Sequence, residues 1–424
     1  MKAYISPNDP ALFGASDSET IQNAIAAAVA GGCRRVEIPR YNLRTQSTVW
    51  IIGTAIRLPS DFSLILDNCH MVQQTGVYDH MFMNENAWQP EKRTLEQEQH
   101  DIRILGVGNV ILSGGEHNGL LEKTALRYGL PPVWKNTMFY WENVRGLRVE
   151  NLYIERQRWW AMTHLYCRDV QLRNLEFYAA PHVPNMDGID LRVGCSDFFL
   201  ENITGRTGDD TIALTALSGR HERACAVPGK ESHIHNVRIR NVLADPFMHL
   251  LVRLLNQDGN QIYDIDLDTV YDTSHPNTKR RPAVTVGIGG PGDVYTSIRR
   301  AQPGETRGIH ARNLTSRGSM AVRFDELCAD SSFTNVKTFG DNSFAAGTLG
   351  MGVVLENILF DHLYYGSDPK RFPIGTSVNV QGYPDRVFHL PGAAGSLTVK
   401  GLEKAWDCTL WEPVEDFELK MEEE

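Results

Sequence analysis

A short motif recurs along most of the chain and restricts its fold more than any other feature. Each copy has an apolar–polar–apolar run, an Asn or Asp, and a second apolar alternation, as in Leu147–Ile154 and Val170–Phe177. The Asn or Asp positions are 151, 174, 202, 241, 266, 313, 335 and 357, and the shorter intervals between them are 22–25 residues. A fixed period of this length with occasional insertions is typical of a solenoid.

The motif also predicts the shape of one coil. Asn tolerates the left-handed backbone region better than most residues, so one Asn per repeat indicates a tight bend between two short strands. Helix signals nearly vanish after residue 50, so the strands follow one another directly. We therefore expect an all-β fold, a right-handed parallel β-helix. A β-sandwich of antiparallel hairpins remains open as an alternative, although it should show more Asn-Gly or Asp-Gly turns.

The start of the chain is different from the repeats. Residues 16–31 predict an amphipathic helix, because Ser16 and Glu19 fit a capping box and Gly31-Gly32 ends the apolar periodicity. A strand at 35–39 follows. We interpret residues 1–50 as an N-terminal cap, since the open end of a sheet core must be covered to avoid edge pairing.

The rest of the chain divides into a β-helix over residues 51–363 and a tail over 364–424. Long insertions at 218–232 and 274–308 interrupt the repeats, and such loops usually build the binding face of a solenoid. The tail is rich in Pro and Gly, then offers strands at 396–399 and 417–421. We interpret it as a C-terminal cap or as a contact between copies in a homo-oligomer.

Charge and composition exclude several classes of partner. The net charge of −10 argues against nucleic acid, which needs a basic face. No apolar run long enough for a transmembrane helix occurs, and no signal peptide follows Met1, so no membrane association is expected. The 7 cysteines are scattered and odd in number, which favours free thiols and a cytoplasmic location. No zinc-type cluster appears, so we expect neither a metal nor another cofactor.

Two acidic turns are the strongest candidates for chemistry. They are Asn185-Met186-Asp187-Gly188-Ile189-Asp190 and Gly208-Asp209-Asp210, and a strand-like run follows each. On neighbouring coils they would lie roughly 4.8 Å apart. Carboxylates held that close repel when ionised, which raises at least one pKa and places a general acid beside a general base. The alternative is that Asp and Gly are ordinary turn residues.

Other candidates fall on the coils before and after these turns. Arg158-Trp159-Trp160 leads to His164 on one coil, and His249 precedes Arg253 by an even number of residues, so both should face the same way in a strand. We expect Trp160, His164, His182, Asn185 and Arg253 to bind substrate, and Asp187, Asp209, Asp210 and His249 to be catalytic. Aromatic rings, carboxylates, a histidine and an arginine in one stripe suit a carbohydrate substrate.

The acidic turns resemble motifs of the polygalacturonase-type glycoside hydrolases (family 28), within the pectin-lyase-like β-helix superfamily. Asn185–Asp190 resembles their Asn-Thr-Asp-Gly-Ile-Asp, and Gly208-Asp209-Asp210 followed by Thr-Ile-Ala-Leu resembles their Gly-Asp-Asp-Cys-Ile-Ala. Residues 158–164 are similar to their Ser-Pro-Phe-Trp-x-x-His. The resemblance covers roughly residues 100–270.

This resemblance implies a right-handed parallel β-helix and inverting hydrolysis without a metal. It makes Asp210 the general acid on one common assignment, and Asp187 and Asp209 the residues that activate water. An inverting pair is about 6.5–9.5 Å apart. The family's Gly-His-Gly reads Met248-His249-Leu250 here, and its Arg-x-Lys, which grips a galacturonate carboxylate, is absent from residues 282–286.

The sequence thus predicts a glycoside hydrolase that cleaves O-glycosidic bonds of plant- or host-derived oligosaccharides or polysaccharides. A cytoplasmic location and the long loops favour exo-action on short, imported substrates. Two alternatives stay open. One is a β-helix polysaccharide lyase, epimerase or glycosyl transferase that uses the same acids differently. The other is a carbohydrate-binding β-helix without catalysis.

Overall fold

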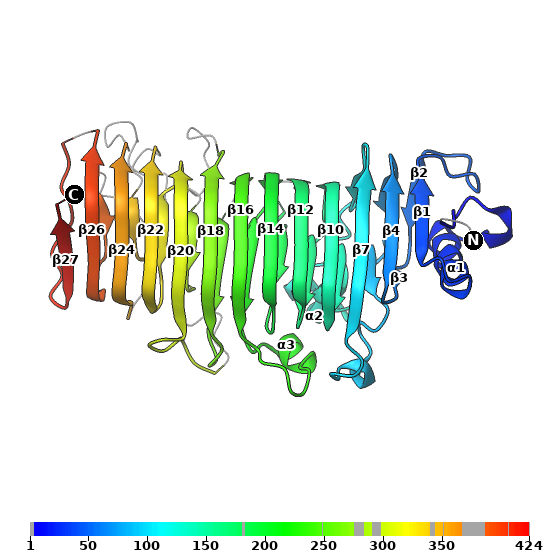
Figure 1. Cartoon of the computed structure of the whole chain (residues 1–424), viewed down its shortest axis with the longest axis horizontal. Helices are drawn as coiled ribbons and strands as arrows, with labels where there is room; N and C mark the ends of the chain where they lie inside the picture. Colours follow the sequence, from blue (N-terminus) through cyan, green and yellow to red (C-terminus); the bar gives the residue numbers. More distant parts are fainter. Residues whose placement is uncertain are drawn as a thin grey trace.

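The chain winds into a parallel β-helix. The computed structural model describes residues 4–179, 183–247, 249–274, 284–290, 298–339, 344–350, 352–366, 386–405 and 407–423. Within these ranges the strands form two sheets, in each of which neighbouring strands run parallel (Figure 1). The parallel β-helix predicted from the repeat is confirmed, and the antiparallel sandwich is excluded.

The larger sheet, called the wide sheet below, has 16 strands. Its main path runs through β1 (Arg35–Pro39), β4 (Phe62–Asp67), β7 (Gln99–Val107), β10 (Val144–Glu155), β12 (Arg168–Tyr178), β14 (Ser196–Thr207), β16 (Ile234–Pro246), β18 (Ile262–Asp272), β20 (Thr306–Ser316), β22 (Cys328–Thr338), β24 (Val354–Tyr365), β26 (Ala394–Lys404) and β27 (Phe417–Glu422). Three further strands join it through β10: β2 (Val49–Ile52), β5 (His70–Gln73) and β8 (Ile111–Ser113).

The second sheet, called the narrow sheet, has 11 strands. They are β3 (Ile56–Leu58), β6 (Phe82–Asn84), β9 (Phe139–Glu142), β11 (Met162–Leu165), β13 (Ile189–Leu191), β15 (Ile212–Ala216), β17 (Leu250–Asn256), β19 (Val284–Ile288), β21 (Met320–Phe324), β23 (Phe344–Gly347) and β25 (Phe388–His389). Side chains alternate across each strand, so one set fills the shared core and the other covers the outer face. The core is largely Ile, Leu, Val and Phe.

The recurring Asn residues make the bends inside the wide sheet. Asn151, Asn174, Asn202 and Asn241 all have positive φ. Their amides form a ladder, in which each Asn donates to the Oδ1 of the Asn one coil earlier at 2.7–3.1 Å. One prediction is wrong: Thr269, not Asp266, takes the bend position on β18, because the register pairs Asp266 with Arg238.

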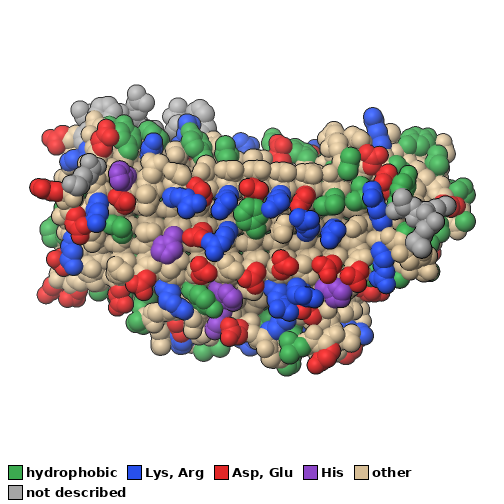
Figure 2. Space-filling model, viewed as in Figure 1, with side chains coloured by type: hydrophobic (Ala, Val, Ile, Leu, Met, Phe, Trp, Pro, Cys, Tyr) green, Lys and Arg blue, Asp and Glu red, His purple; other side chains and the backbone are tan. Residues whose placement is uncertain are grey.

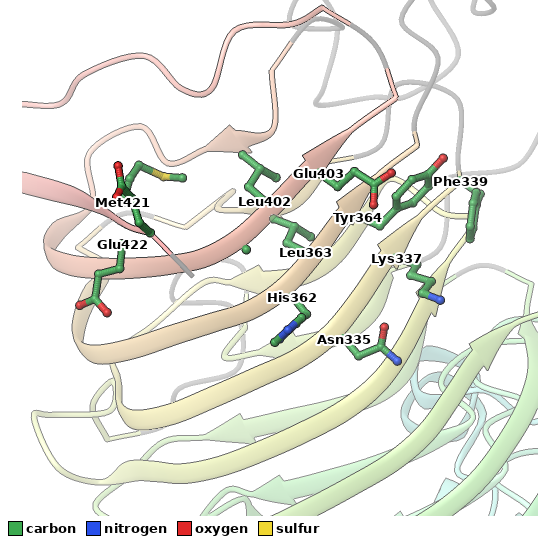
Figure 3. A pocket seen from close by; sticks show the side chains of 12 residues that line it. Asn335, Lys337, Phe339, His362, Leu363, Tyr364, Leu402, Glu403, Met421 and Glu422 are labelled. Carbon is green, nitrogen blue, oxygen red and sulfur yellow. The ribbon is translucent and has the colours of Figure 1, made fainter.

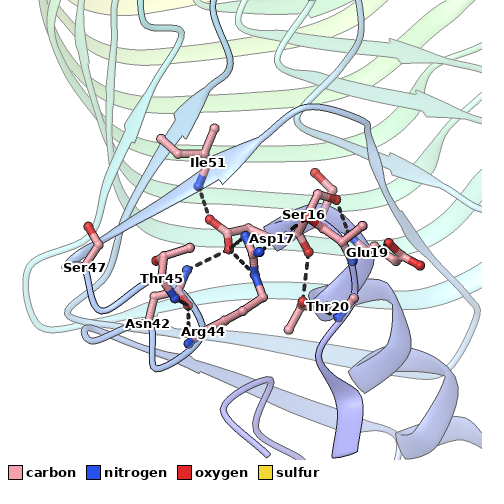
Figure 4. Close-up of polar contacts among 12 residues, drawn as sticks. Ser16, Asp17, Glu19, Thr20, Asn42, Arg44, Thr45, Ser47 and Ile51 are labelled. Carbon is pink, nitrogen blue, oxygen red and sulfur yellow. Dashed lines mark hydrogen bonds and ion pairs between the residues drawn. The ribbon is translucent and has the colours of Figure 1, made fainter. Parts of the chain in front are cut away.

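The N-terminal helix forms as the sequence predicts. Helix α1 (Asp17–Ala30) begins after Ser16, whose hydroxyl accepts from the Glu19 amide at 3.1 Å. Its apolar face packs into the first coils of the core. Asp17 is 1% exposed and accepts from Arg44 at 2.6 Å and from the Ile51 amide at 2.7 Å, which ties the helix to the first strands (Figure 4).

The remaining described helices are short; the first precedes α1, and the others lie in loops between strands. They are η1 (Pro10–Leu12), η2 (Pro90–Lys92), α2 (Glu122–Tyr128), η3 (Val133–Asn136) and α3 (Arg220–Ala224). Helix α3 projects from one side of the solenoid near its middle (Figure 1). None of the helices in the described ranges has the length and apolar character needed to span a membrane.

The outer face of the wide sheet is charged with both signs. Figure 2 shows basic and acidic side chains interspersed in bands across the strands. Arg312 lies 2.8 Å from Asp268, and Arg173 lies 3.7 Å from Glu201 on the next strand. Farther along, β26 and β27 continue the pairing of this sheet, so the described part of the C-terminal stretch adds two strands to the wide sheet, besides β25 in the narrow sheet.

Candidate functional site

The two acidic turns lie on neighbouring coils, as the repeat predicted. Asp187 precedes β13 and Asp210 precedes β15, each by two residues, and Ile189 pairs with Ile212 in the parallel register. The next strand, β17, follows His249 directly, and its Val252 pairs with Ile212. Three consecutive strand starts of the narrow sheet therefore bring Asp187, Asp210 and His249 together.

Asp210 is the best-connected group of this cluster. Its Oδ1 lies 2.6 Å from His249 Nδ1 and accepts from the Leu250 amide at 3.2 Å. Its Oδ2 accepts from Arg253 Nη1 at 3.1 Å. His249 Nδ1 is also 3.4 Å from an oxygen of Asp209. The expectation that His249 and Arg253 face the same way is confirmed, because both contact Asp210.

The carboxyl groups of the cluster differ in their electrostatics. Burial and three neighbouring carboxylates raise the pKa of Asp187 well above its usual range. Burial, aided by the adjacent Asp210, raises the pKa of Asp209. Burial acts in the same direction on Asp210, but the charges and hydrogen bonds of His249 and Arg253 outweigh it and lower the pKa to about 2. The site therefore holds an ionised carboxylate beside carboxyls that retain their protons to higher pH.

These groups line one cavity of about 980 Å³. A volume of this size is typical of small-molecule sites. The cavity lining includes seven of the residues predicted from the sequence: Trp160, Asn185, Asp187, Asp209, Asp210, His249 and Arg253. The backbone N–H of Asn185 donates to Asp209 Oδ2 at 3.2 Å, so the main chain at Asn185 also orients a carboxyl group.

Two predicted binding residues are not in this cavity. The prediction for His164 is wrong: its side chain is 0% exposed and packs edge-on against Phe198 in the core, with ring centroids 5.4 Å apart. His164 alternates with Thr163 along β11, so only one of the two can face outward. Burial lowers the pKa of His164 to about 4. His182 lies outside the described residues.

The cavity also contains residues that sequence reasoning did not assign. Asp190 lines its floor, and Arg192, Trp134, His221 and Glu222 line one wall. The guanidinium of Arg192 lies beside two perpendicular rings, 5.3 Å from the centroid of Trp134 and 4.9 Å from that of Trp160, and it pairs with Glu222. The ring of His221 stacks on Trp134 with centroids 4.1 Å apart.

The sequence indicates some of these residues but not others. Asp190 and Arg192 are two residues apart, so strand alternation places both on one side and could have found the pair. Trp134 and His221 come from η3 and α3, and nothing in their local sequence shows where these insertions fold.

The outer face of the narrow sheet is covered on both sides of the cavity. Toward the N-terminus, Tyr140 of β9 stacks on Trp88 with centroids 5.1 Å apart, and its hydroxyl lies 2.9 Å from His221 Nε2. Toward the C-terminus, Leu250, Val284, Met320 and Phe344 form a separate buried apolar cluster. A Cβ on Gly287 would come within 2.0 Å of a Leu250 methyl, so Leu250 covers the next strand.

Some of these residues could also hold a cation. Ligand atoms of Asp209, Asp210 and His249 all lie within 4.8 Å of one another. However, the charge of Asp210 is already balanced by Arg253, and its second oxygen faces His249. The arrangement therefore fits acid–base chemistry better than metal binding.

A second hollow lies at the C-terminal end of the solenoid, with a volume of about 1060 Å³. It lies on the outer face of the wide sheet, across β22, β24, β26 and β27, and its lining includes Lys337, His362, Tyr364 and Glu403 (Figure 3). The labelled side chains are spread over several strands, and no carboxyl pair comes together among them. The narrow-sheet cavity is therefore the candidate active site.

Comparison with known proteins agrees with this fold. No family model matches the chain. A stretch of 183 residues is 25% identical to Polygalacturonase QRT2 of Arabidopsis thaliana, and covers 42% of this chain and 38% of that protein. The match confirms the resemblance to polygalacturonase-type hydrolases, as that of a divergent relative.

Solved structures show the same architecture. A variant tailspike protein of Escherichia coli bacteriophage HK620, in complex with a hexasaccharide, aligns with a TM-score of 0.61 at 12% identity, over 99% of this chain and 78% of the other. The catalytic domain of GH87 alpha-1,3-glucanase in complex with nigerose gives 0.56 at 14% identity, over 98% and 67%. PfbA, a surface adhesin of Streptococcus pneumoniae, gives 0.55 at 13% identity, over 99% and 92%. At these identities the likeness shows the fold alone.

Proposed function

We propose that the chain is an inverting glycoside hydrolase that cleaves O-glycosidic bonds in plant- or host-derived oligosaccharides or polysaccharides. The observation that carries the proposal is the opposite shift of two adjacent carboxyl groups in one cavity, Asp209 upward and Asp210 downward. Carboxyls whose environments push their pKa values apart are the usual acid and base of such a site. The similarity to a polygalacturonase supports the same reaction class.

The electrostatics suggest roles that depart from the assignment implied by the resemblance. Asp209 is the better general acid, because its side chain is 22% exposed and its pKa is raised by burial and by the adjacent Asp210. It would protonate the glycosidic oxygen as the bond to the anomeric carbon breaks. Asp210 stays ionised and would take a proton from the attacking water. An oxygen of Asp210 lies within 4.8 Å of an oxygen of Asp209, which is shorter than the usual separation of an inverting pair, so the configuration of the product is the decisive measurement. Asp187 has an oxygen without a hydrogen-bond partner and would orient this water.

We further propose that the enzyme is exo-acting. An endo-acting enzyme needs a groove through which a polymer passes on both sides of the cleaved bond. Here the aromatic group of Trp88, Tyr140, Trp134 and His221 closes one side, and the apolar cluster around Leu250 covers the other. Because both sides of the cavity are covered, they support cleavage at the end of a short oligosaccharide.

The experiment is a reducing-sugar screen followed by substitution of the acids. Asp187→Asn and Asp209→Asn should each lower kcat by about 10²–10⁴-fold, the usual contribution of acid–base catalysis, while the fold stays intact by circular dichroism. Asp169→Asn, at an exposed bend outside the cavity, is the matched control and should keep full activity.

Product chemistry separates the alternatives. NMR of the first product should show an inverted anomeric configuration, and retention would exclude the proposed mechanism. An unsaturated sugar product would instead indicate a lyase. Oligosaccharide binding without turnover by the wild-type protein would support a non-catalytic carbohydrate-binding β-helix.

A further inference from the structure

One column of outward-facing residues crosses the floor of the cavity. The parallel register aligns Thr163, Asp190, Ala213, Arg253 and Gly287 on successive strands from β11 to β19. Three residues of this column, Asp190, Ala213 and Arg253, line the cavity, and Ala213 has by far the shortest side chain of them. Since strands lie about 4.8 Å apart, Asp190 and Arg253 flank it at about one strand spacing on each side. The floor is therefore hollow over Ala213.

Asp190 borders this hollow without a hydrogen-bond partner in the protein, although the charges of Arg192 and Arg253 act on it. Its side chain is 1% exposed, and neither carboxyl oxygen has a hydrogen bond in the structure. A buried polar group left unsatisfied costs about 1–3 kcal/mol, so such a group is expected to have a role outside the fold's own stability. Burial also raises the pKa of Asp190 well above its usual range. A protonated carboxyl can both donate to and accept from hydroxyl groups.

The buried cations near the hollow are already compensated. Arg253 pairs with Asp210 at 3.1 Å, and Arg192 pairs with Glu222 and also lies near the rings of Trp134 and Trp160. Burial lowers the pKa of His221 to about 3, which leaves this ring neutral near pH 7. Arg220 lies exposed at the rim. Within the described lining, a sugar carboxylate over Ala213 would thus meet Asp190 and no uncompensated buried cation.

We propose that the hollow over Ala213 seats one uncharged sugar ring and that Asp190 is a specificity-determining residue that hydrogen-bonds the hydroxyl groups of this ring. The inference rests on the proposed hydrolase function and names its substrate class: neutral oligosaccharides, not oligouronides. Trp160, on the coil before Asp187, lines the same cavity.

The test compares neutral oligosaccharides with oligouronides of equal length. The wild-type protein should prefer a neutral substrate by at least about tenfold in kcat/KM, and Asp190→Ala should lower that value by about 10–100-fold, the loss expected for one or two buried hydrogen bonds. Asp190→Asn keeps donor and acceptor capacity and should restore activity to within a few fold. Ala213→Leu fills the seat and should abolish binding, measured by calorimetry in the Asp209→Asn background.

The outcomes separate this inference from the hydrolase proposal. Preferred hydrolysis of uronides, or an Asp190→Ala enzyme as active as the Asp169→Asn control, overturns the inference and leaves the hydrolase intact. If a neutral oligosaccharide binds in a way that depends on Asp190 but is not hydrolysed, the proposed sugar seat stands and the proposed hydrolase function is wrong. A wild-type protein that neither binds nor cleaves any of the sugars overturns both.

Discussion

At the residue scale, the aspartates of the cavity show how neighbours give one side chain different properties. Asp209 and Asp210 are adjacent in sequence, yet their pKa values shift in opposite directions. The cause is Arg253 and His249, which reach Asp210 from the next coil. The sequence predicted that these acids would be close together. It did not predict which one would be ionised, because that depends on tertiary contacts with a later strand.

Removing the charge of Arg253 should move the acid limb of the pH profile. In Arg253→Met, only His249 still offsets the burial of Asp210, so the pKa of this carboxyl should rise from about 2 by about 1–3 units. A base that must be ionised loses activity as the pH falls through its pKa, so the variant should lose kcat/KM at a higher pH than the wild type. Arg253→Lys retains the charge and should shift less. An unchanged acid limb in Arg253→Met would mean that Asp210 is not the base.

At the element scale, the bends carry most of what the sequence predicts about the fold. A backbone at positive φ favours Asn, and the side-chain amide of this Asn can hydrogen-bond to the Asn of the neighbouring coil. The motif therefore recurs at the bends of successive coils. Thr269 is an exception, because this bend has positive φ without an Asn. The side-chain amide of Asn313 on the following coil donates to the neighbouring Asp268 instead, so the ladder continues without an Asn at position 269. The insertions carry no such periodic constraint, which is why the wall formed by η3 and α3 could not be predicted.

The bend at Asn202 gives a stability prediction. Its φ is 58°, and its amide donates to Asn174 and accepts from Asn241. Asn202→Gly keeps the backbone free to adopt this φ and loses only the ladder bonds, whereas Asn202→Ala adds about 1–2 kcal/mol for a Cβ in the left-handed region, and Asn202→Val adds more. The thermal unfolding midpoint should be highest for Asn202→Gly, lower for Asn202→Ala and lowest for Asn202→Val, with all three below the wild type.

The control for this series is Glu176→Ala, at an exposed position on β12 with ordinary strand geometry. It should change the midpoint little. If Asn202→Ala matched this control, or if Asn202→Gly were the least stable variant, the bend would not depend on left-handed geometry.

At the scale of the whole molecule, the narrow sheet presents one long outer face, and only a short part of this face lines the cavity. Parallel stacking repeats the same outward positions on every coil, so a groove along the axis is the default form of this architecture. Here the column that holds Asp187 and Asp210 continues as Leu250, Val284, Met320 and Phe344, which pack together and are buried. The change from acids to apolar residues along one column converts a groove into a pocket.

A closed pocket predicts the product pattern. The wild-type enzyme should release one short product from the first time point, because only a chain end fits between the aromatic wall and the Leu250 cluster. Trp134→Ala combined with His221→Ala removes the stacked pair that forms the wall, and should let longer chains enter and yield a mixture of product lengths. His310→Ala, at an exposed position on β20, is the control and should leave the pattern unchanged. Chromatography of early products checks this. A ladder of intermediate lengths from the wild type would show that the ends of the cavity admit a continuous chain, and exo-action would then be wrong.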